Sequence, residues 1–178
     1  MALDIVPLLP LERGQLHVMR VRGAIFALAL LAIALVVEFV ALDRVLGEYG
    51  VRKGTLTIVA GALSLWMVAI APARRWRHWG YAFTGSELHV SHGWLFQVHT
   101  IVPVARVQHI DVAQGPIERA FGVTTLVLHT AGTEASTVSL PGVARETAEG
   151  IRDAIRAHIG RAHIGRAHIG RAHIGSAQ

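Results

Sequence analysis

The chain has 178 residues, of which 52% are hydrophobic, and it contains no cysteine, which excludes disulfides and thiolate metal sites. Its net charge of +5 is unevenly spread: residues 1–78 have nine Lys and Arg against five Asp and Glu, residues 79–155 have four against seven, and the remainder has four against none. The segment 79–155 is therefore mildly acidic, which argues against a nucleic-acid-binding surface.

Two apolar runs occupy residues 23–42 and 54–73. Each run has about 20 residues, so as a helix rising ~1.5 Å per residue it would cross a ~30 Å hydrocarbon layer. The connector between them, residues 43–53, is too short to fold by itself. The sequence therefore predicts a transmembrane helical hairpin over residues 23–73, after an N-terminal segment of residues 1–22.

Basic residues are more numerous on the side of the termini than in the connector. The terminal side has Arg13, Arg20, Arg22, Arg74, Arg75 and Arg77, and the connector has Arg44, Arg52 and Lys53. Because cytoplasmic segments carry the excess of Lys and Arg, this six-to-three bias predicts cytoplasmic termini. The expected location is the bacterial inner membrane, with two spans and with the remaining domain against the inner leaflet.

The junction after the second run combines cations with aromatic side chains. It contains Arg74, Arg75, Trp76, Arg77 and Trp79, followed by Tyr81. Tryptophan and tyrosine favour the membrane–water interface, and a cation near anionic lipid gains ~1 kcal/mol. We expect this junction to lie at the membrane surface.

Glu38 is the only ionisable residue within either apolar run. A carboxylate in hydrocarbon is unfavourable, which makes Glu38 a functional candidate on a proton or solute path. The alternative is structural, because Glu38 lies near a helix end, where it can reach the interface or meet Arg44 or Arg52.

From Tyr81 onward the pattern changes to an alternation of apolar and polar residues. It predicts half-buried antiparallel strands near residues 87–91, 94–98, 109–112, 126–129 and 137–140. A helical spacing then follows, with Ala144, Ala148, Ile151, Ile155 and Ile159 on one stripe. Residues 79–159 are therefore expected to form an α+β domain, a pleckstrin-homology-like (PH-like) antiparallel barrel or sandwich closed by an amphipathic helix.

The central run of residues 103–122, with residues 130–132 and 140–142, resembles the bacterial PH-like domain of the YdbS-like family of membrane proteins. The tandem apolar runs and the opening of the domain, residues 81–90, are similar to that family too. The resemblance implies a membrane-anchored, non-catalytic PH-like module that works beside a larger membrane protein with several such domains.

The segment 114–122 has the densest group of unusual residue types. A structural interpretation gives it a tight turn at Gly115 and Pro116 and a helical turn whose Ile117 and Phe121 dock into the core. A functional interpretation projects a rigid corner toward a partner, with an ion pair from Arg106 or Arg119 to Asp111. The interaction candidates are Arg106, Gln108, Asp111, Gln114, Gly115, Pro116, Glu118 and Arg119, with Glu118 and Arg119 directed outward.

No catalytic, cofactor or metal site is predicted. The histidines of the domain alternate along strands, and no nucleophile context accompanies them. Residues 79–155 contain four arginines and no lysine, which argues against phosphoinositide recognition by the domain. The tail of residues 160–178 repeats the motif Arg-Ala-His-Ile-Gly and is expected to be disordered or a frayed helix; loose metal capture and an inert repeat both stay open.

These patterns favour a non-enzymatic interaction or scaffold protein that lies in the lipid bilayer and docks onto another membrane protein of the same family or onto itself. Two alternatives stay open: an accessory subunit of a lipid or solute transport system with Glu38 on the path, and a lipid-surface sensor. No small-molecule substrate is indicated.

Overall fold

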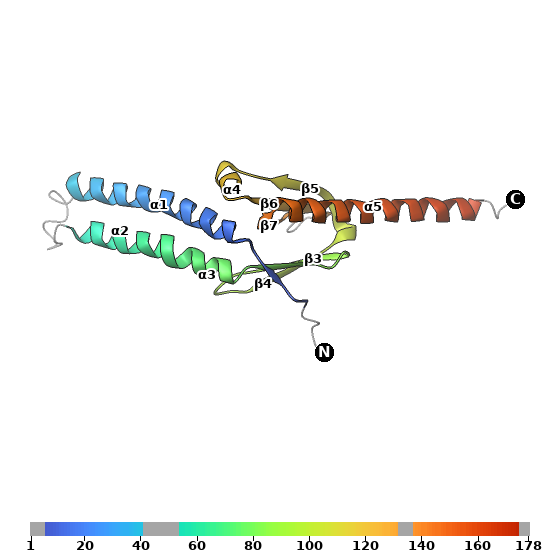
Figure 1. Cartoon of the computed structure of the whole chain (residues 1–178), viewed down its shortest axis with the longest axis horizontal. Helices are drawn as coiled ribbons and strands as arrows, with labels where there is room; N and C mark the ends of the chain where they lie inside the picture. Colours follow the sequence, from blue (N-terminus) through green and yellow to red (C-terminus); the bar gives the residue numbers. More distant parts are fainter. Residues whose placement is uncertain (1–5, 41–53, 132–136, 175–178) are drawn as a thin grey trace.

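The computed structural model describes residues 6–40, 54–131 and 137–174, with side-chain surroundings as far as residue 160. A pair of long helices extends from one end of a β-sheet domain, and the C-terminal helix extends from the opposite end (Figure 1). The chain thus places its apolar hairpin and its repetitive tail on opposite sides of the domain.

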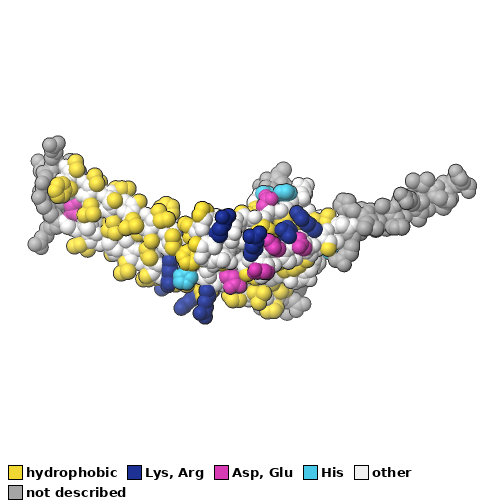
Figure 2. All heavy atoms as spheres, turned by 45° about the horizontal axis from the view of Figure 1, so that its top comes forward, with side chains coloured by type: hydrophobic (Ala, Val, Ile, Leu, Met, Phe, Trp, Pro, Cys, Tyr) yellow, Lys and Arg dark blue, Asp and Glu magenta, His cyan; other side chains and the backbone are white. Residues whose placement is uncertain are grey.

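The hairpin consists of two long helical segments lying side by side (Figure 1). The first is α1 (Arg13–Val40); the second comprises α2 (Thr55–Leu65), one π-helical turn η3 (Trp66–Ile70) and α3 (Ala71–Arg77). In their most apolar windows only 6% and 17% of residues are buried, so these are not core helices of a globular domain. Both are long and apolar enough to cross a membrane, and hydrophobic side chains cover the face of the hairpin seen in Figure 2.

Small residues allow the two helical segments to approach closely. A Cβ atom added at Gly23 would lie 2.9 Å from the carbonyl oxygen of Met67, closer than van der Waals contact allows. Farther along, Ala27 and Ser64 are both buried between the helices, and Ser64 Oγ donates a hydrogen bond to the Ala27 carbonyl at 3.4 Å. Close backbone approach through small residues is the usual way in which apolar helices pack in lipid.

The domain contains two antiparallel sheets. The first has the order β1-β2-β3-β4, and the second has the order β5-β6-β7. The strands are β1 (Leu9–Pro10), β2 (Gly80–Phe83), β3 (Glu87–His92), β4 (Val98–Pro103), β5 (Val107–Ala113), β6 (Val123–Thr130) and β7 (Thr137–Ala144). A 3₁₀ turn η4 (Val104–Arg106) joins the sheets, and the short helix α4 (Pro116–Ala120) joins β5 to β6. Within the described residues no strand of one sheet pairs with a strand of the other, so the structure is an open sandwich and not the closed barrel that was one expectation.

The core lies between the sheets and the first half of α5 (Arg145–Ile174). Leu88 and Val90 of the first sheet and Leu126 and Leu128 of the second are at most 1% exposed. The predicted helical stripe is confirmed from Ala148 onward, because Ala148, Ile151 and Ile155 are buried and Ile159 is partly buried against them. Ala144, predicted as its first member, is instead the last residue of β7. The α+β class and the closing amphipathic helix therefore follow the sequence pattern.

The N-terminal segment, predicted as a separate stretch of residues 1–22, contributes to the domain. Leu9 and Pro10 pair with β2, and Leu11 is only 2% exposed in the core. The amide of Glu12 donates to the carbonyl of Gly142 at 2.9 Å, and α1 begins at Arg13 instead of residue 23. The hairpin is consequently joined to the domain from both of its ends.

Two further boundaries differ from expectation. The predicted strand near residues 94–98 begins only at Val98, because Gly93, at φ 112°, turns the chain back and leaves Trp94 and Phe96 in a loop. At the C-terminus, the backbone of α5 is helical through the repeat to Ile174, although the glycine spacing predicts a helix that ends near Ile159.

Tyr81 lies in the core at 7% exposure, and not in the predicted interfacial belt. Burial, and secondarily the negative charge of Glu12, raise the pKa of Tyr81 above its ordinary value of 10.0. The folded state therefore favours the neutral phenol, and this contribution to stability is present below about pH 10 and is lost as pH rises through the raised pKa. We expect Tyr81→Phe to flatten the decline of stability above pH 10, measured by urea unfolding of the full chain in detergent. An unchanged decline in the variant would contradict this assignment.

Candidate interaction surface

Glu118 is buried at 7% exposure, so the expectation that it projects outward is wrong. Its Oε2 accepts a hydrogen bond from the amide of Gly115 at 2.7 Å, which caps α4. Its Oε1 lies 3.1 Å from Nη2 of Arg22 in α1 and accepts from the hydroxyl of Thr125 at 3.4 Å. Glu118 thus fastens the α4 corner to both the first helix and the second sheet.

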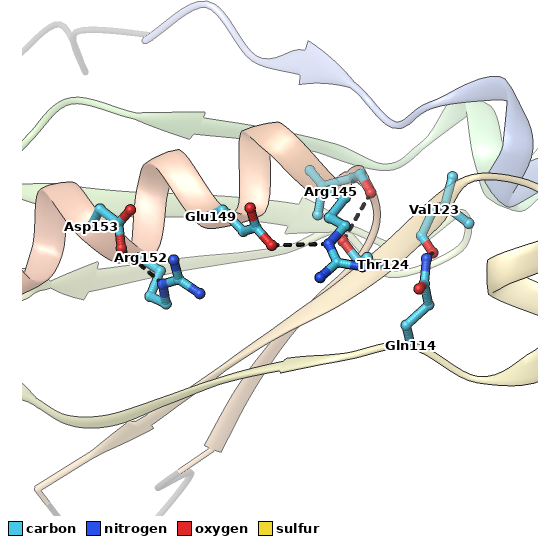
Figure 3. Close-up of polar contacts among 8 residues, drawn as sticks. Gln114, Val123, Thr124, Arg145, Glu149, Arg152 and Asp153 are labelled. Atoms are coloured by element: carbon cyan, nitrogen blue, oxygen red, sulfur yellow. Dashed lines mark hydrogen bonds and ion pairs between the residues drawn. The ribbon is translucent and has the colours of Figure 1, made fainter.

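The rest of the corner is divided between structural and exposed residues. Gln114 Nε2 donates to the Val123 carbonyl at 3.0 Å, a contact visible in Figure 3. Phe121, expected in the core, is 37% exposed and stacks on His17 with ring centroids 5.4 Å apart. Arg119 is exposed and stays available to a partner. The corner therefore offers much less recognition surface than its sequence predicts.

Asp111 does not form the ion pair predicted with Arg106 or Arg119. Its carboxylate lies 2.9 Å from His109 Nε2 and 3.2 Å from His129 Nε2, all three side chains being at least 40% exposed. Such exposed pairs contribute little to stability. The candidates Arg106 and Gln108 are both exposed, Gly115 is the N-cap of α4, and Pro116 is its first residue.

The junction residues separate into exposed cations and tethering tryptophans. Arg74, Arg75 and Arg77 are exposed, and Figure 2 shows Lys and Arg side chains where the apolar hairpin meets the domain. Trp76 Nε1 instead donates to the carbonyls of Leu11 and Glu12, both at 3.2 Å. Trp79 stacks on His92 at 4.8 Å between ring centroids. The tryptophans hold the domain against the helices.

Glu38 contacts the beginning of α2. It accepts hydrogen bonds from the amides of Gly54 and Thr57, the latter at 3.2 Å, and from the hydroxyl of Thr57. The first amides of a helix lack partners within the helix, and a carboxylate there is favourable. These contacts account for Glu38 in structural terms, whereas the predicted partners Arg44 and Arg52 lie outside the described residues.

The sequence analysis did not identify an apolar edge on the first sheet. Strand β4 ends the order β1-β2-β3-β4, so its outer side has no strand partner among the described residues. Val98 and Ile101 on this strand are 46% and 49% exposed, and the preceding loop exposes Leu95 and Phe96 at 76% and 80%. We call these four residues the β4 edge. The available signal was the apolar cluster Trp94–Phe96 next to Val98 and Ile101, which the alternation pattern alone assigns to a half-buried strand.

The visible flank of α5 has a different character, because it is lined by charged pairs. Arg145 Nε lies 2.9 Å from Glu149, and Arg152 Nε lies 2.9 Å from Asp153 (Figure 3). Within the described part of the chain, no group of three or more His, Asp or Glu side chains is arranged to hold a metal. The β4 edge, by contrast, is apolar and exposed.

Comparison with known proteins agrees with this architecture. The Bacterial PH domain family matches residues 23–159, which include most of α1, the second helical segment and strands β2 to β7. The chain belongs to this family. The match is one continuous range that covers residues of both the hairpin and the domain. It confirms the resemblance that the sequence indicated.

Two curated relatives are transmembrane proteins of Bacillus subtilis (strain 168). UPF0699 transmembrane protein YdbS is 34% identical over 92 residues, which cover 52% of this chain and 56% of YdbS. UPF0699 transmembrane protein YdbT is 29% identical over 100 residues, which cover 55% of this chain and 20% of YdbT. The chain thus spans about half of the first relative and a fifth of the second. No solved structure gives a significant match.

The chain is accordingly a transmembrane protein with a PH-like domain. The names of its relatives indicate no enzyme activity.

Proposed function

We propose that this protein is a non-enzymatic scaffold of the bacterial inner membrane, whose PH-like domain docks onto another membrane protein of the same family or onto a second copy of itself. The observation that carries the proposal is the β4 edge. It combines unpaired backbone donors and acceptors with the exposed side chains of Val98 and Ile101. Native proteins usually protect such an edge with charges or a covering element.

Strand addition explains why an apolar edge is retained. A partner strand would complete the hydrogen bonds of β4 and contact Val98 on one face of the sheet and Ile101 on the other, because positions three apart on a strand lie on opposite faces. The neighbouring positions on β4 are His99 and Thr100, so no Lys, Arg, Asp or Glu opposes association there.

The proposed topology places both termini in the cytoplasm and the two helices across the membrane. Its support is the six-to-three excess of basic residues on the terminal side of the hairpin and the exposure of apolar side chains along it. The β4 edge would then face partners at the inner leaflet.

The test is photo-crosslinking in native membranes. A photoreactive amino acid at Ile101 should give specific crosslinked products, identified by mass spectrometry, whereas the same group at Glu146, on the charged beginning of α5, should give few. Two differently tagged copies of the chain distinguish self-association from a second protein, since only self-association crosslinks both tags.

The variant Val98→Lys should abolish the products from Ile101, because a charge on an edge strand opposes pairing. Ala154→Lys is the matched control, since it adds the same charge at an exposed position of α5, away from the β4 edge. Equal crosslinking from Ile101 and Glu146, or products unaffected by Val98→Lys, would overturn docking at the β4 edge. A third photoreactive group at Arg119 tests the α4 corner: products from this position and none from Ile101 would move the docking surface to that corner and overturn the proposal.

A further inference from the structure

A cavity of about 620 Å³ lies where the helical hairpin meets the domain. Its walls come from α1, from the η3 and α3 parts of the second helical segment, from the β3–β4 loop and from β7. Ligand sites typically have volumes of about 300–1,000 Å³, so the cavity can hold a headgroup and the beginning of a hydrocarbon chain. Because it lies at the end of the apolar hairpin, it would open at the level of lipid headgroups.

Three cationic side chains line this cavity: Arg22, Arg74 and Arg75. Arg22 is already paired with Glu118 at 3.1 Å, which neutralises its charge. Arg74 is held against the ring of Trp94, with 4.9 Å from its guanidinium carbon to the ring centroid. Arg74 and Arg75 therefore supply the uncompensated positive charge, and guanidinium groups are well suited to binding phosphate.

Gln15 gives an independent indication of a ligand. The residue lines the cavity and is only 3% exposed, and its Oε1 is buried without a hydrogen-bond partner among the described residues. A buried polar atom without a partner is unfavourable by about 1–3 kcal/mol. A hydroxyl or ammonium group of a ligand in the cavity would satisfy this acceptor.

The wall on the membrane side is apolar. Phe26 of α1 and Trp66 and Met67 of η3 line it. The second helical segment forms its single π-helical turn, Trp66–Ile70, at this place, and such turns frequently occur at functional sites. The cavity therefore has a cationic end toward the domain and an apolar end toward the membrane.

We propose that this cavity binds one anionic phospholipid with a hydroxyl-bearing headgroup. The phosphate lies between Arg74 and Arg75, a headgroup hydroxyl donates to Gln15 Oε1, and the first part of an acyl chain lies against Phe26 and Met67. The ligand class follows from three parts of the cavity wall: the arginine pair, the acceptor of Gln15 and the apolar end. Free phosphate would leave the apolar end empty. The assignment rests on the membrane-spanning part of the proposed function and is independent of docking at the β4 edge.

Lipid retention measured by native mass spectrometry tests the assignment. The full chain is purified in detergent and offered phosphatidylglycerol, phosphatidic acid, phosphatidylcholine or inorganic phosphate. We expect retention of one phosphatidylglycerol at least tenfold above phosphatidylcholine. Inorganic phosphate should not displace it. Gln15→Leu should reduce the preference for phosphatidylglycerol over phosphatidic acid, because only the former brings glycerol hydroxyls.

The double variant R74A/R75A should lower phosphatidylglycerol retention at least tenfold. The double variant R145A/R152A removes the same charge from α5, outside the cavity, and should retain the lipid. Equal losses in the two variants, or equal retention of phosphatidylglycerol and phosphatidylcholine by the unmodified chain, would overturn the proposal. Displacement by inorganic phosphate would assign the site to a soluble anion instead.

The unmodified chain tests lipid selectivity even if R74A/R75A does not fold. The variant Val98→Lys separates the two proposals, since it should lose crosslinking and keep the lipid. A chain that keeps its partner but shows no lipid selectivity would contradict only the cavity assignment.

Discussion

Replacing Gly142 by alanine should destabilise the protein by about 2–5 kcal/mol, the sum of backbone strain and of overpacking by the added methyl group. Gly142 has φ 73°, a left-handed conformation that is unfavourable for alanine by about 1–2 kcal/mol. An added Cβ would also overlap the side chain of the buried Gln15, and overpacking of this kind adds about 1–3 kcal/mol.

The conformation of Gly142 has an identifiable cause. Thr124 pairs with Val143 and Thr125 pairs with Pro141, so Gly142 is the extra residue of a β-bulge in β7. Its carbonyl accepts the hydrogen bond from Glu12 that precedes α1. The bulge therefore makes room for the beginning of the first helix against the second sheet.

Gly85→Ala is the matched control for this prediction. Gly85 has φ 89°, so alanine there carries similar backbone strain, but nothing lies within 4 Å of the added Cβ. Thermal unfolding of the full chain in detergent, followed by near-ultraviolet circular dichroism, should show a distinctly lower Tm for Gly142→Ala than for Gly85→Ala. At about 2–4 °C per kcal/mol for a chain of this size, the difference is measurable. Equal Tm values would show that Gln15 moves aside freely.

The local patterns of the sequence predicted most of the fold because each reports one element by itself. Apolar runs indicated the two helices, alternation indicated β3, β5, β6 and β7, and the stripe from Ala148 to Ile155 indicated the covering helix. The sequence predicted the contacts between these elements less completely. The sequence around Leu11 does not show that this residue enters a core built from residues 81 to 155. It also does not show that the carbonyls of Leu11 and Glu12 accept hydrogen bonds from Trp76.

The candidate site was predicted less completely, for the same physical reason. The composition of residues 114–122 correctly marked an unusual corner, but the direction of Glu118 depends on Arg22, which is 96 residues away in the sequence. The β4 edge depends on strand order, and the cavity depends on four separated segments that converge. Such properties arise from tertiary arrangement and are not encoded in any one window of sequence.

Glu118→Ala should destabilise the protein by about 2–4 kcal/mol, since hydrogen bonds to a charged group contribute about 1.5–3 kcal/mol and this carboxylate accepts more than one. It caps α4 through the Gly115 amide at 2.7 Å and approaches Arg22 at 3.1 Å. Glu118→Gln keeps an acceptor for that amide and should show less than half of the loss. The measurement is again Tm of the full chain in detergent.

A double-mutant cycle with Arg22→Ala separates the two roles of Glu118. The Arg22 side chain is 54% exposed, so its ion pair with Glu118 is screened and should contribute only about 0.5–1 kcal/mol. If capping of α4 dominates, Glu118→Ala will remain strongly destabilising in the Arg22→Ala background. The control is Arg119→Ala, on the same helical turn but exposed, and its stability should stay within about 0.5 kcal/mol of the unmodified chain. The contrary result is a coupling energy between the two substitutions as large as the full destabilisation by Glu118→Ala. The ion pair between Arg22 of α1 and Glu118 of α4 would then be the main contribution of Glu118 to stability, and α1 would depend on this carboxylate for its position on the domain.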